Sequence, residues 1–399
     1  MRILQINNNH YRKSGTDSVY LNTIELLRKN HHEVIPFSFE DSQNIIEQES
    51  KYFIPKNILS KTFGKFYSFP AKKNIERLIV DKKPDVAHFH NIIGGLSLSI
   101  LPILQRNKIP TVVTIHGFKY LCPAYVFIDG KGNICEDCKT GKYINCFLNN
   151  CAPEGRIKSF ALALEAYARD FFIPFTNYID KYIFLSNFYL QKYSEFYPEI
   201  KSKSTFFYNF INEIGTDSGY FEERENYFLF FGRLDREKGI KTLLEAFAKI
   251  PTIKLKIIGG GELENYVIEN KTDNVEYLGY QNWAELKTFV KKSSFVIIPS
   301  ECYENNPMTI IESYSLGKPV IGANIGGIPE IIKNEETGFL FQMKNTNDLI
   351  QTIQKASEIS NDAYETMSKN SLKFAKENFS ADIYYEKLIA VYTSLLEKD

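Results

Sequence analysis

Residues 294–319 read SFVIIPSECYENNPMTIIESYSLGKP, and this stretch decides how the chain is expected to fold. The apolar and β-branched run at 295–298 predicts a buried strand. Asn306 as N-cap and Pro307 at the first helical position predict a helix start, and Gly317 predicts the helix end. A buried strand, a polar loop and a helix in this order indicate one unit of a parallel α/β sheet.

Two glutamates suggest a chemistry for this stretch. Glu304 lies in the loop, and Glu312 lies about two turns into the predicted helix. The N–H groups of Met308, Thr309 and Ile310 are expected to point into the same space. A helix start that follows a strand binds anions, and a carboxylate on each side accepts hydroxyl donors. Phosphates flanked by sugar hydroxyls describe a nucleotide-sugar, and the alternative is a surface helix with two solvated glutamates.

The sequence on both sides repeats the alternation of strands and helices. In the second half, strands are expected at 227–231, 255–258, 275–278, 295–298 and 319–321, with helices at 240–248 and after the glycine turns at 259–261 and 326–327. In the first half, strands are expected at 2–6, 32–37, 85–89, 110–115, 181–185 and 205–207, with helices at 17–29 and 156–172. Both halves therefore predict a doubly wound parallel sheet.

The 399 residues are long enough for two domains. We expect an N-terminal domain at 1–208, with a C-terminal helix at 382–399 packing back on it, and a C-terminal domain at 209–381. The 48 basic and 48 acidic residues balance, with a basic excess in the first half and an acidic excess in the second. Neither half is basic enough to indicate nucleic acid as a partner.

No run approaches the roughly 18 uninterrupted apolar residues of a membrane span, and the N-terminus MRILQINNNH lacks the apolar region of a signal peptide. We expect a cytoplasmic protein that can bind peripherally to the inner face of the membrane. Residues 50–83 interleave lysines with aromatic rings, which suits an anionic membrane surface. The alternative for this segment is a solvated loop with a few aromatic side chains in the core.

Five of the six cysteines cluster between residues 122 and 151, in a segment that interrupts the alternation and has the character of an insertion. The spacing of Cys135, Cys138, Cys146 and Cys151 could hold a structural zinc ion. Disulfides are disfavoured in a cytoplasmic chain, so the alternative is a group of reduced thiols packed inside the segment.

Four motifs occur in an order that resembles a known family: Gly232-Arg233-x4-Lys238-Gly239, Gly260-Gly261, Glu304-x7-Glu312 and Gly326-Gly327-x-Pro329-Glu330. With a strand that ends at His116, they look like the retaining GT-B glycosyltransferases of family 4, also called group 1. The resemblance spans nearly the whole chain. It implies an α/β fold of two Rossmann-like, doubly wound parallel-sheet domains that face a cleft. It also implies that the domain at 1–208 binds the acceptor and that the domain at 209–381 binds the nucleotide-sugar. Many relatives carry a glycine pair in the first loop, where this chain has Ser14-Gly15.

The residues favour a chemistry that needs no metal. Transfer from a nucleotide-sugar releases a diphosphate, whose charge must be stabilised by a metal or by fixed cations and N–H dipoles. No Asp-x-Asp sequence suggests the metal route. Arg233 and Lys238, five residues apart across a loop, can converge on the two phosphates as a fork and a point charge. We therefore expect no required cofactor and no metal.

The resemblance implies roles for the site residues. Glu304 holds hydroxyls of the donor sugar, Glu312 holds the ribose, and His116 reaches the sugar from the other domain. Arg233 and Lys238 complete the set expected to act in catalysis. Further contacts with the donor are expected from Gly15, Gly232, Asn306, Pro307, Met308 and Thr309.

The expected function is transfer of a hexose from a nucleotide-sugar, UDP rather than GDP on family grounds, to a glycan or glycolipid acceptor. Such an acceptor is a lipid-linked or growing surface polysaccharide, for example of a capsule or O-antigen. A second hypothesis is a sugar-nucleotide 2-epimerase of the same fold, which releases nucleotide without an acceptor. A third is a non-catalytic nucleotide-sugar-binding protein, which would bind nucleotide tightly without turnover.

Overall fold

The computed structural model describes residues 1–55, 67–93, 95–215 and 224–397. It divides into two compact units, the first formed by Met1–Phe207 with Tyr384–Asp399 and the second by Tyr208–Ile383. The boundaries predicted from the sequence lie within about three residues of these. Within the described residues, no helix is both long enough and apolar enough to cross a membrane.

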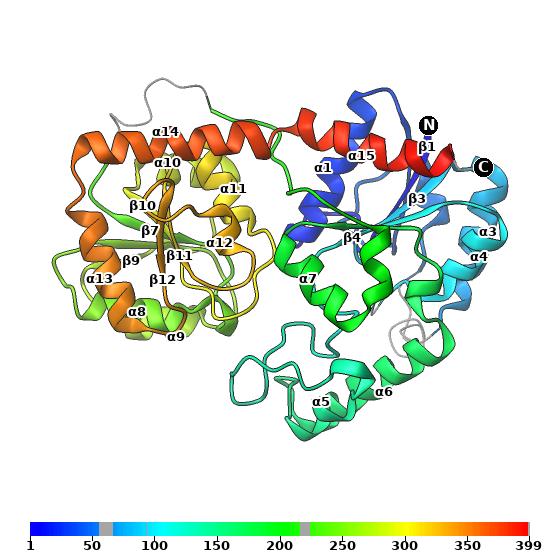
Figure 1. Cartoon of the computed structure of the whole chain (residues 1–399), viewed down its shortest axis with the longest axis horizontal. Helices are drawn as coiled ribbons and strands as arrows, with labels where there is room; N and C mark the ends of the chain where they lie inside the picture. The colour runs from blue at the N-terminus through cyan, green and yellow to red at the C-terminus, as the bar shows by residue number, and fades with distance from the viewer. Residues whose placement is uncertain (56–66, 94, 216–223, 398–399) are drawn as a thin grey trace. The chain divides into compact units, whose positions relative to one another are not determined.

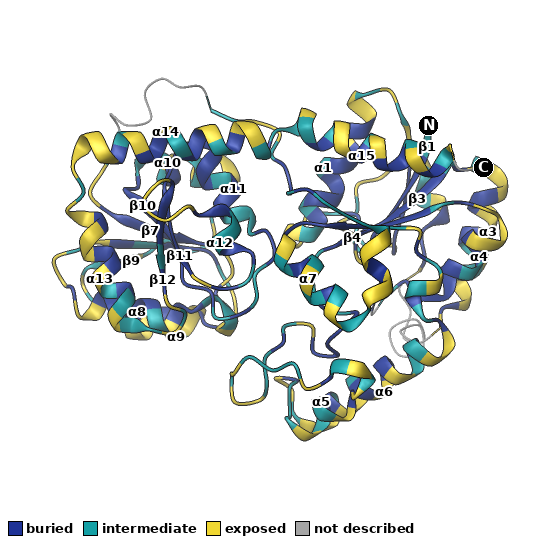
Figure 2. Ribbon diagram, in the orientation of Figure 1, coloured by how far each residue is buried: buried dark blue, intermediate teal, exposed yellow. Residues whose placement is uncertain are grey.

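Unit 1 is built on a six-stranded parallel sheet with the order β2-β1-β3-β4-β5-β6. Chain order reverses between β1 and β3, so the loops after these two strands lie at the topological switch point, where open α/β sheets bind ligands. All residues of β3 and β4 are buried (Figure 2), because helices cover both faces of a parallel sheet. The strands are β1 (Arg2–Ile6), β2 (Glu33–Phe37), β3 (Val86–Phe89), β4 (Thr111–Ile115), β5 (Lys181–Phe184) and β6 (Ser204–Phe206).

Two helices of unit 1, α5 and α6, pack against each other, and α5 lies with the segment that contains the cysteines at the end of the unit away from its sheet (Figure 1). The last helix of the chain, α15, returns to this unit and packs on it from Tyr384 onward. The helices are α1 (Gly15–Lys29), α3 (Phe69–Lys82), α4 (Leu101–Arg106), α5 (Ile144–Leu148), α6 (Arg156–Phe172), α7 (Asn187–Phe196) and α15 (Ala381–Leu396).

Unit 2 repeats the architecture with the strand order β12-β11-β10-β7-β8-β9, all parallel. Its switch point lies between β7 and β10. Helices α11 and α14 pack together above the sheet in Figure 1, and α8 packs with α13 and α9 below it. The strands are β7 (Phe228–Phe231), β8 (Leu255–Ile258), β9 (Val275–Tyr277), β10 (Phe295–Ile298), β11 (Val320–Ala323) and β12 (Gly338–Phe341). The helices are α8 (Ile240–Ala248), α9 (Glu264–Asn270), α10 (Trp283–Lys292), α11 (Met308–Ser315), α12 (Ile328–Ile331), α13 (Thr346–Ser357) and α14 (Asn361–Asn378).

The predicted start of α11 is wrong by one residue, and its cap is not the predicted one. The helix begins at Met308 with Pro307 in the cap position, and Pro307 has an extended backbone. Asn306 does not cap the helix, because its side-chain oxygen accepts a hydrogen bond from the Asn209 N–H at 2.7 Å. Glu312 is consequently the fifth helical residue, just over one turn into the helix rather than two.

The lysine- and aromatic-rich segment at 50–83 divides into parts with different environments. Tyr52 and Phe53 are buried in the core, as the alternative interpretation expected, whereas Tyr67 and Phe69 near the start of α3 are exposed. The predicted membrane-facing residues Lys56, Lys61, Phe63, Lys65 and Phe66 lie outside the described residues. The membrane surface therefore stays a prediction.

Candidate active site

The loop after β7 carries the first predicted motif and is held against the end of β10. Gly239 has a φ of 70° and lies so close to the Pro299 carbonyl that a Cβ atom there would come within 1.8 Å of its oxygen. Glycine alone tolerates both the conformation and the contact. The N–H of Glu301 donates to the Glu237 carbonyl at 2.8 Å and joins the same two loops. These loops follow the two strands of the switch point in unit 2.

Lys238 and Glu304 meet between these loops. Lys238 Nζ lies 2.6 Å from Glu304 Oε1, and the Ser300 hydroxyl donates to the same oxygen at 2.7 Å. Burial acts to lower the pKa of Lys238, but the attraction of Glu304 outweighs it and the pKa is raised. Burial likewise acts to raise the pKa of Glu304, but Lys238 and Ser300 outweigh it and the pKa is lowered. Both groups are therefore charged at neutral pH.

The Gly326-Gly327 turn, which follows β11, packs against the backbone of Glu304. The Gly327 N–H donates to the Glu304 carbonyl at 2.8 Å. A Cβ atom on Gly326, whose φ is 63°, would lie 2.4 Å from that carbonyl oxygen. A side chain at this position would push the carboxylate-bearing loop away, so this motif acts by positioning Glu304.

Arg233 pairs with carboxylates of its own loop. Its side chain is 63% exposed and pairs with Asp235 and, at 3.1 Å, with Glu237. Its charge nevertheless contributes to the pKa shifts of both Lys238 and Glu304, so it lies in the same electrostatic neighbourhood. The predicted fork on the diphosphate therefore requires Arg233 to exchange its carboxylate partners for phosphate.

The start of α11 differs from the predicted row of three free amides. The Ile310 N–H donates to the Pro307 carbonyl at 3.0 Å, which leaves Met308 and Thr309 as the predicted donors at the first two helical positions. Burial raises the pKa of Glu312 to about 8. Glu312 is therefore mostly protonated at pH 7, whereas Glu304 is ionised.

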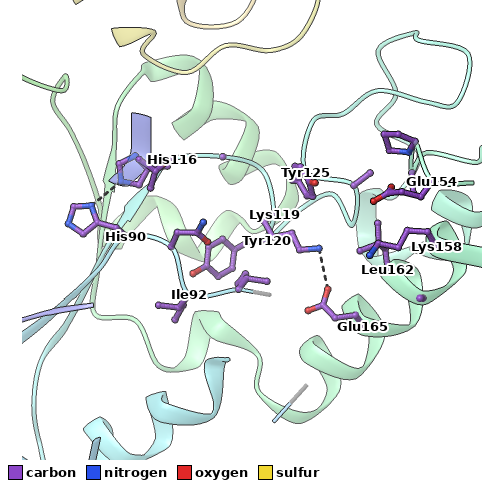
Figure 3. Close-up of a pocket in the computed structure, with 18 of the residues that line it drawn as sticks. His90, Ile92, His116, Lys119, Tyr120, Tyr125, Glu154, Lys158, Leu162 and Glu165 are labelled. Atoms are coloured by element: carbon purple, nitrogen blue, oxygen red, sulfur yellow. Dashed lines mark hydrogen bonds and ion pairs between the residues drawn. The ribbon is translucent and has the colours of Figure 1, made fainter. Parts of the chain in front are cut away.

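In unit 1, His90 and His116 directly follow β3 and β4, as the sequence predicts (Figure 3). The amide group of Gln5 donates to the Tyr392 hydroxyl at 3.2 Å, so its oxygen accepts from His90 Nε2 at 3.1 Å. His90 Nδ1 then accepts from His116 Nε2 at 3.0 Å. Burial lowers the pKa of His116 to about 3 and that of His90 well below its usual value, so both rings are neutral. This network leaves His116 Nδ1 as a hydrogen-bond acceptor.

The His88 ring belongs to the same network and connects it to the C-terminal helix. Its Nδ1 accepts from the Tyr392 hydroxyl at 2.7 Å, and its Nε2 donates to Thr114 Oγ1 at 2.8 Å. Tyr392 lies on α15, the last helix of the chain. Through its hydrogen bond with Gln5, this helix helps to position His90 and His116. This connection was not predicted from the sequence.

A cavity of about 580 Å³ opens beside His116 in unit 1. Thr16, the residue after Gly15 at the start of α1, lines it together with both histidines. Across from them, Lys119 and Glu165 form an ion pair with 3.4 Å between Nζ and Oε2 (Figure 3). Burial lowers the pKa of Lys119 despite this partner. Sequence reasoning missed both residues, although an acidic residue within the apolar run FALALEAYA was a visible signal.

The described residues do not form the zinc site that the spacing of the cysteines could have held. Across residues 1–55, 67–93, 95–215 and 224–397, no group of three or more histidine, cysteine or acidic side chains is arranged to hold a metal ion. All six cysteines are free thiols, and Cys138 and Cys146 are buried. Burial raises the pKa of Cys138 to about 12, which keeps this thiol protonated. The described geometry agrees with the alternative of packed, reduced thiols.

The fold and the motifs define a GT-B glycosyltransferase. A family model described as Glycosyltransferase Family 4 matches residues 13–213, and one described as Glycosyl transferases group 1 matches residues 216–374. The first covers half of the chain. The chain therefore belongs to glycosyltransferase family 4, and it is an enzyme of the glycosyltransferase class.

Two relatives and one solved structure illustrate this membership. An uncharacterized glycosyltransferase of Methanocaldococcus jannaschii is 27% identical over 83% of this chain and 82% of its own length. A UDP-Gal:α-D-GlcNAc-diphosphoundecaprenol α-1,3-galactosyltransferase of Escherichia coli is 29% identical over 37% of this chain and 38% of its own length. Anabaena HepE in complex with UDP superposes with a TM-score of 0.68 and 14% identity, over 99% of this chain and 100% of HepE. The last similarity concerns the fold alone.

Proposed function

We propose that the enzyme transfers a hexose from a UDP-sugar to a lipid-linked or growing surface polysaccharide, with retention at the anomeric carbon and without a metal. The observation that carries this proposal is the Lys238–Glu304 pair at the switch point of unit 2. One ionised lysine and one ionised glutamate are fixed there by Ser300 and the Gly326-Gly327 turn. A phosphate needs a cation, and a sugar hydroxyl needs an acceptor; this pair supplies both.

In the proposed reaction, the bond from the anomeric carbon to the diphosphate oxygen breaks and a bond to the acceptor oxygen forms on the same face. The acceptor proton goes to the departing phosphate oxygen. Lys238, Arg233 and the amides of Met308 and Thr309 stabilise the charge that develops on the diphosphate. Gly232 lets the β7 loop approach the phosphates closely. No protein side chain needs to act as a nucleophile in this scheme.

The remaining site residues hold the donor. Glu304 accepts hydroxyls of the hexose, and Glu312 accepts the ribose hydroxyls. His116 contributes from unit 1, where its neutral ring presents Nδ1 to a hydroxyl of the sugar, and Gly15 at the start of α1 approaches the donor phosphate. The UDP-sugar and the lipid-linked acceptor are supported by the name of the E. coli relative and by the UDP bound to HepE.

The experiment that tests this proposal measures nucleoside diphosphate release from a panel of UDP- and GDP-sugars, with and without lipid-linked acceptors. Release that depends on the acceptor is expected, together with a product of retained configuration. Acceptor-independent release with interconversion of epimers would instead identify a 2-epimerase. Tight nucleotide binding without turnover on any donor would identify a non-catalytic binding protein.

A further inference from the structure

Helix α6 exposes a stripe of apolar side chains, although it buries the charged side chains of Glu165 and Arg169. The exposed side chains follow the spacing i, i+3, i+7, i+10, i+14, which places them in one line along the helix. They are Ile157, Phe160, Leu164, Tyr167 and Phe171, and together they define the outward face of α6. A helix that only covers a core directs such a stripe inward. The packing of unit 1 therefore does not account for this face.

Helix α5 widens the outward face along one side. The two helices pack together, with the rings of Phe147 and Phe160 5.6 Å apart between centroids. The Ile144 N–H donates to the Tyr167 hydroxyl at 3.1 Å. Ile144 and Leu148 of α5 are themselves exposed. The apolar surface therefore spans two adjacent helices.

The surface continues at the other end of α6, toward the start of α3. The rings of Phe171 and Phe172 lie 5.1 Å apart between centroids, and both side chains are exposed. Phe172 and Tyr67 line the same cavity of about 400 Å³. The ring of Tyr67 lies 4.8 Å from that of Phe69, which is also exposed. Exposed apolar side chains thus follow one another from α5 over α6 to α3.

The exposed apolar area is large for a surface that faces only water. The four aromatic side chains of α6 are 41–81% exposed, and at about 200 Å² each they expose on the order of 500 Å². The largest apolar patch on a typical monomer is about 300–600 Å² and often has a function. Ile157 and Leu164 add to the area on α6 alone. An exposed patch of this size indicates a binding partner.

The charged residues at the edges of this surface are basic. Arg156, at the start of α6, is exposed. Lys142 is exposed two residues before Ile144, and Lys73 is exposed one turn after Phe69 on α3. Apolar and aromatic side chains edged by cations match the interface of an anionic lipid bilayer, where acyl chains lie beneath phosphates.

A second copy of this chain matches the surface less well. The outward face lies wholly within the described residues, and Arg156 is the one charged residue among the exposed positions of α6. Glu165 is buried, and Asp170 accepts from Arg169 at 3.0 Å. Glu154, which precedes the helix, lines the cavity beside His116 (Figure 3). The same face of a second copy would bring no exposed carboxylate of α6 to these cations.

We propose that the outward face of α6, with the exposed side chains of α5 and of the start of α3, docks unit 1 on an anionic lipid bilayer. The helix, about 25 Å long, lies flat in the interface, with its apolar side chains among the acyl chains and the flanking cations at lipid phosphates. Docking of this face needs neither donor nor acceptor, so it is independent of the proposed sugar transfer.

The test is flotation of the full chain with lipid vesicles, without nucleotide or sugar. Vesicles of equal parts phosphatidylglycerol and phosphatidylcholine are compared with vesicles of phosphatidylcholine alone. We expect stronger binding to the anionic vesicles, and this difference should shrink as salt is added. Absence of binding to the anionic vesicles would overturn the proposal. A dimer that Leu164→Glu converts to a monomer in light scattering would identify a second copy as the partner and would also overturn it.

Substitutions on the outward face should weaken vesicle binding selectively. Leu164→Glu and Phe171→Glu should each weaken it about tenfold or more, because an apolar side chain is replaced by an anion. Arg156→Gln should weaken binding to anionic vesicles about fivefold and leave binding to neutral ones unchanged.

Ile268→Glu is the matched control for Leu164→Glu. Ile268 lies on α9 of unit 2 and is 49% exposed, close to the 52% of Leu164. It should bind vesicles within twofold of the parent. Thermal unfolding verifies that each variant is folded, which is expected because the replaced side chains are exposed. An equal loss of binding in both variants would show that the location of the charge is irrelevant and would contradict docking through α6.

A tryptophan reporter locates the inserted face directly. The chain has a single tryptophan, Trp283, so Trp283→Phe provides a silent background. In that background, Phe171→Trp should shift its emission to the blue on anionic vesicles and be quenched by lipids with brominated acyl chains. Ile268→Trp should keep the emission of a water-exposed ring. If the protein floats with vesicles while the reporter at 171 stays unquenched, another surface binds the bilayer and the proposal is wrong.

Discussion

Replacing Lys238 by methionine tests the central contact of the proposed donor site. The substitution keeps the length of the side chain and removes the charge that lies 2.6 Å from Glu304. If Lys238 stabilises the departing diphosphate, its loss should lower kcat by about 10²–10³, the cost of one preorganised transition-state contact. This corresponds to about 3–4 kcal/mol of activation free energy.

The same substitution also affects stability, and the structure lets the two effects be separated. Lys238 and Glu304 are 24% and 13% exposed, so Glu304 would lose its ion partner and keep only the Ser300 hydroxyl. We expect the free energy of unfolding to fall by about 2 kcal/mol, since a buried acceptor loses its charged donor. In the double variant Lys238→Met/Glu304→Gln, stability should largely recover because no charge is left unpaired, whereas activity should not.

Lys249→Met is the matched control. Lys249 pairs with Glu245 at 3.0 Å in the same unit, but both side chains are more than half exposed. Such a pair contributes little, so stability should change by less than about 0.5 kcal/mol and the rate should stay near that of the parent. Urea unfolding gives the stability, and release of nucleoside diphosphate under saturating donor gives kcat. A near-normal rate for a folded Lys238→Met protein would refute the assignment of the donor site.

Three further predictions concern protonation, the C-terminal helix and metals. Burial raises the pKa of Glu312 to about 8, so the folded protein keeps a proton that the unfolded chain loses near pH 4.5. The contribution of Glu312 to the free energy of unfolding should therefore fall as pH rises from 4.5 to 8. Glu312→Gln should flatten this part of the pH profile measured by urea unfolding. Tyr392→Phe should lower the free energy of unfolding by about 1–3 kcal/mol, because it removes the buried hydroxyl that binds both His88 Nδ1 and the Gln5 amide. This loss should exceed that of Tyr385→Phe on the same helix, whose hydroxyl is only part-buried against His32. Transfer should continue in the presence of EDTA, and a strict requirement for Mg²⁺ in the rate assay would contradict a mechanism based on cations and dipoles of the protein.

Much of the fold follows from local patterns in the sequence. The strand at 295–298 is found at its predicted residues, because a short, β-branched apolar run that ends at a proline favours a strand covered on both faces. The ordered motifs that resemble the family also pointed to the correct class of enzyme. The strand at 338–341 and the long helix at 361–378 were not anticipated, although Ser360, whose side chain caps that helix, was a visible start signal.

The cap of α11 shows why local signals can mislead. Asparagine is a residue type that often caps helices, but the side-chain oxygen of Asn306 accepts a hydrogen bond from the backbone N–H of Asn209 instead. Asn209 lies nearly a hundred residues earlier in the chain. A tertiary hydrogen bond thus replaces the local one. The His88–Tyr392 contact and the setting of Glu165 depend on residues that are distant along the chain in the same way. Sequence patterns cannot show such partners, because only folding brings them together.

The two cations of the proposed donor site in unit 2 are paired with carboxylates. Arg233 lies against Asp235 and Glu237, and Lys238 lies against Glu304. A diphosphate must therefore compete with carboxylates for these side chains, and its binding gains less than free cations would provide. The pairing has a compensating effect, because it holds Lys238 and Glu304 in fixed positions when the donor arrives. We therefore expect such a site to bind the donor less tightly but to hold its charged groups in position for the transition state.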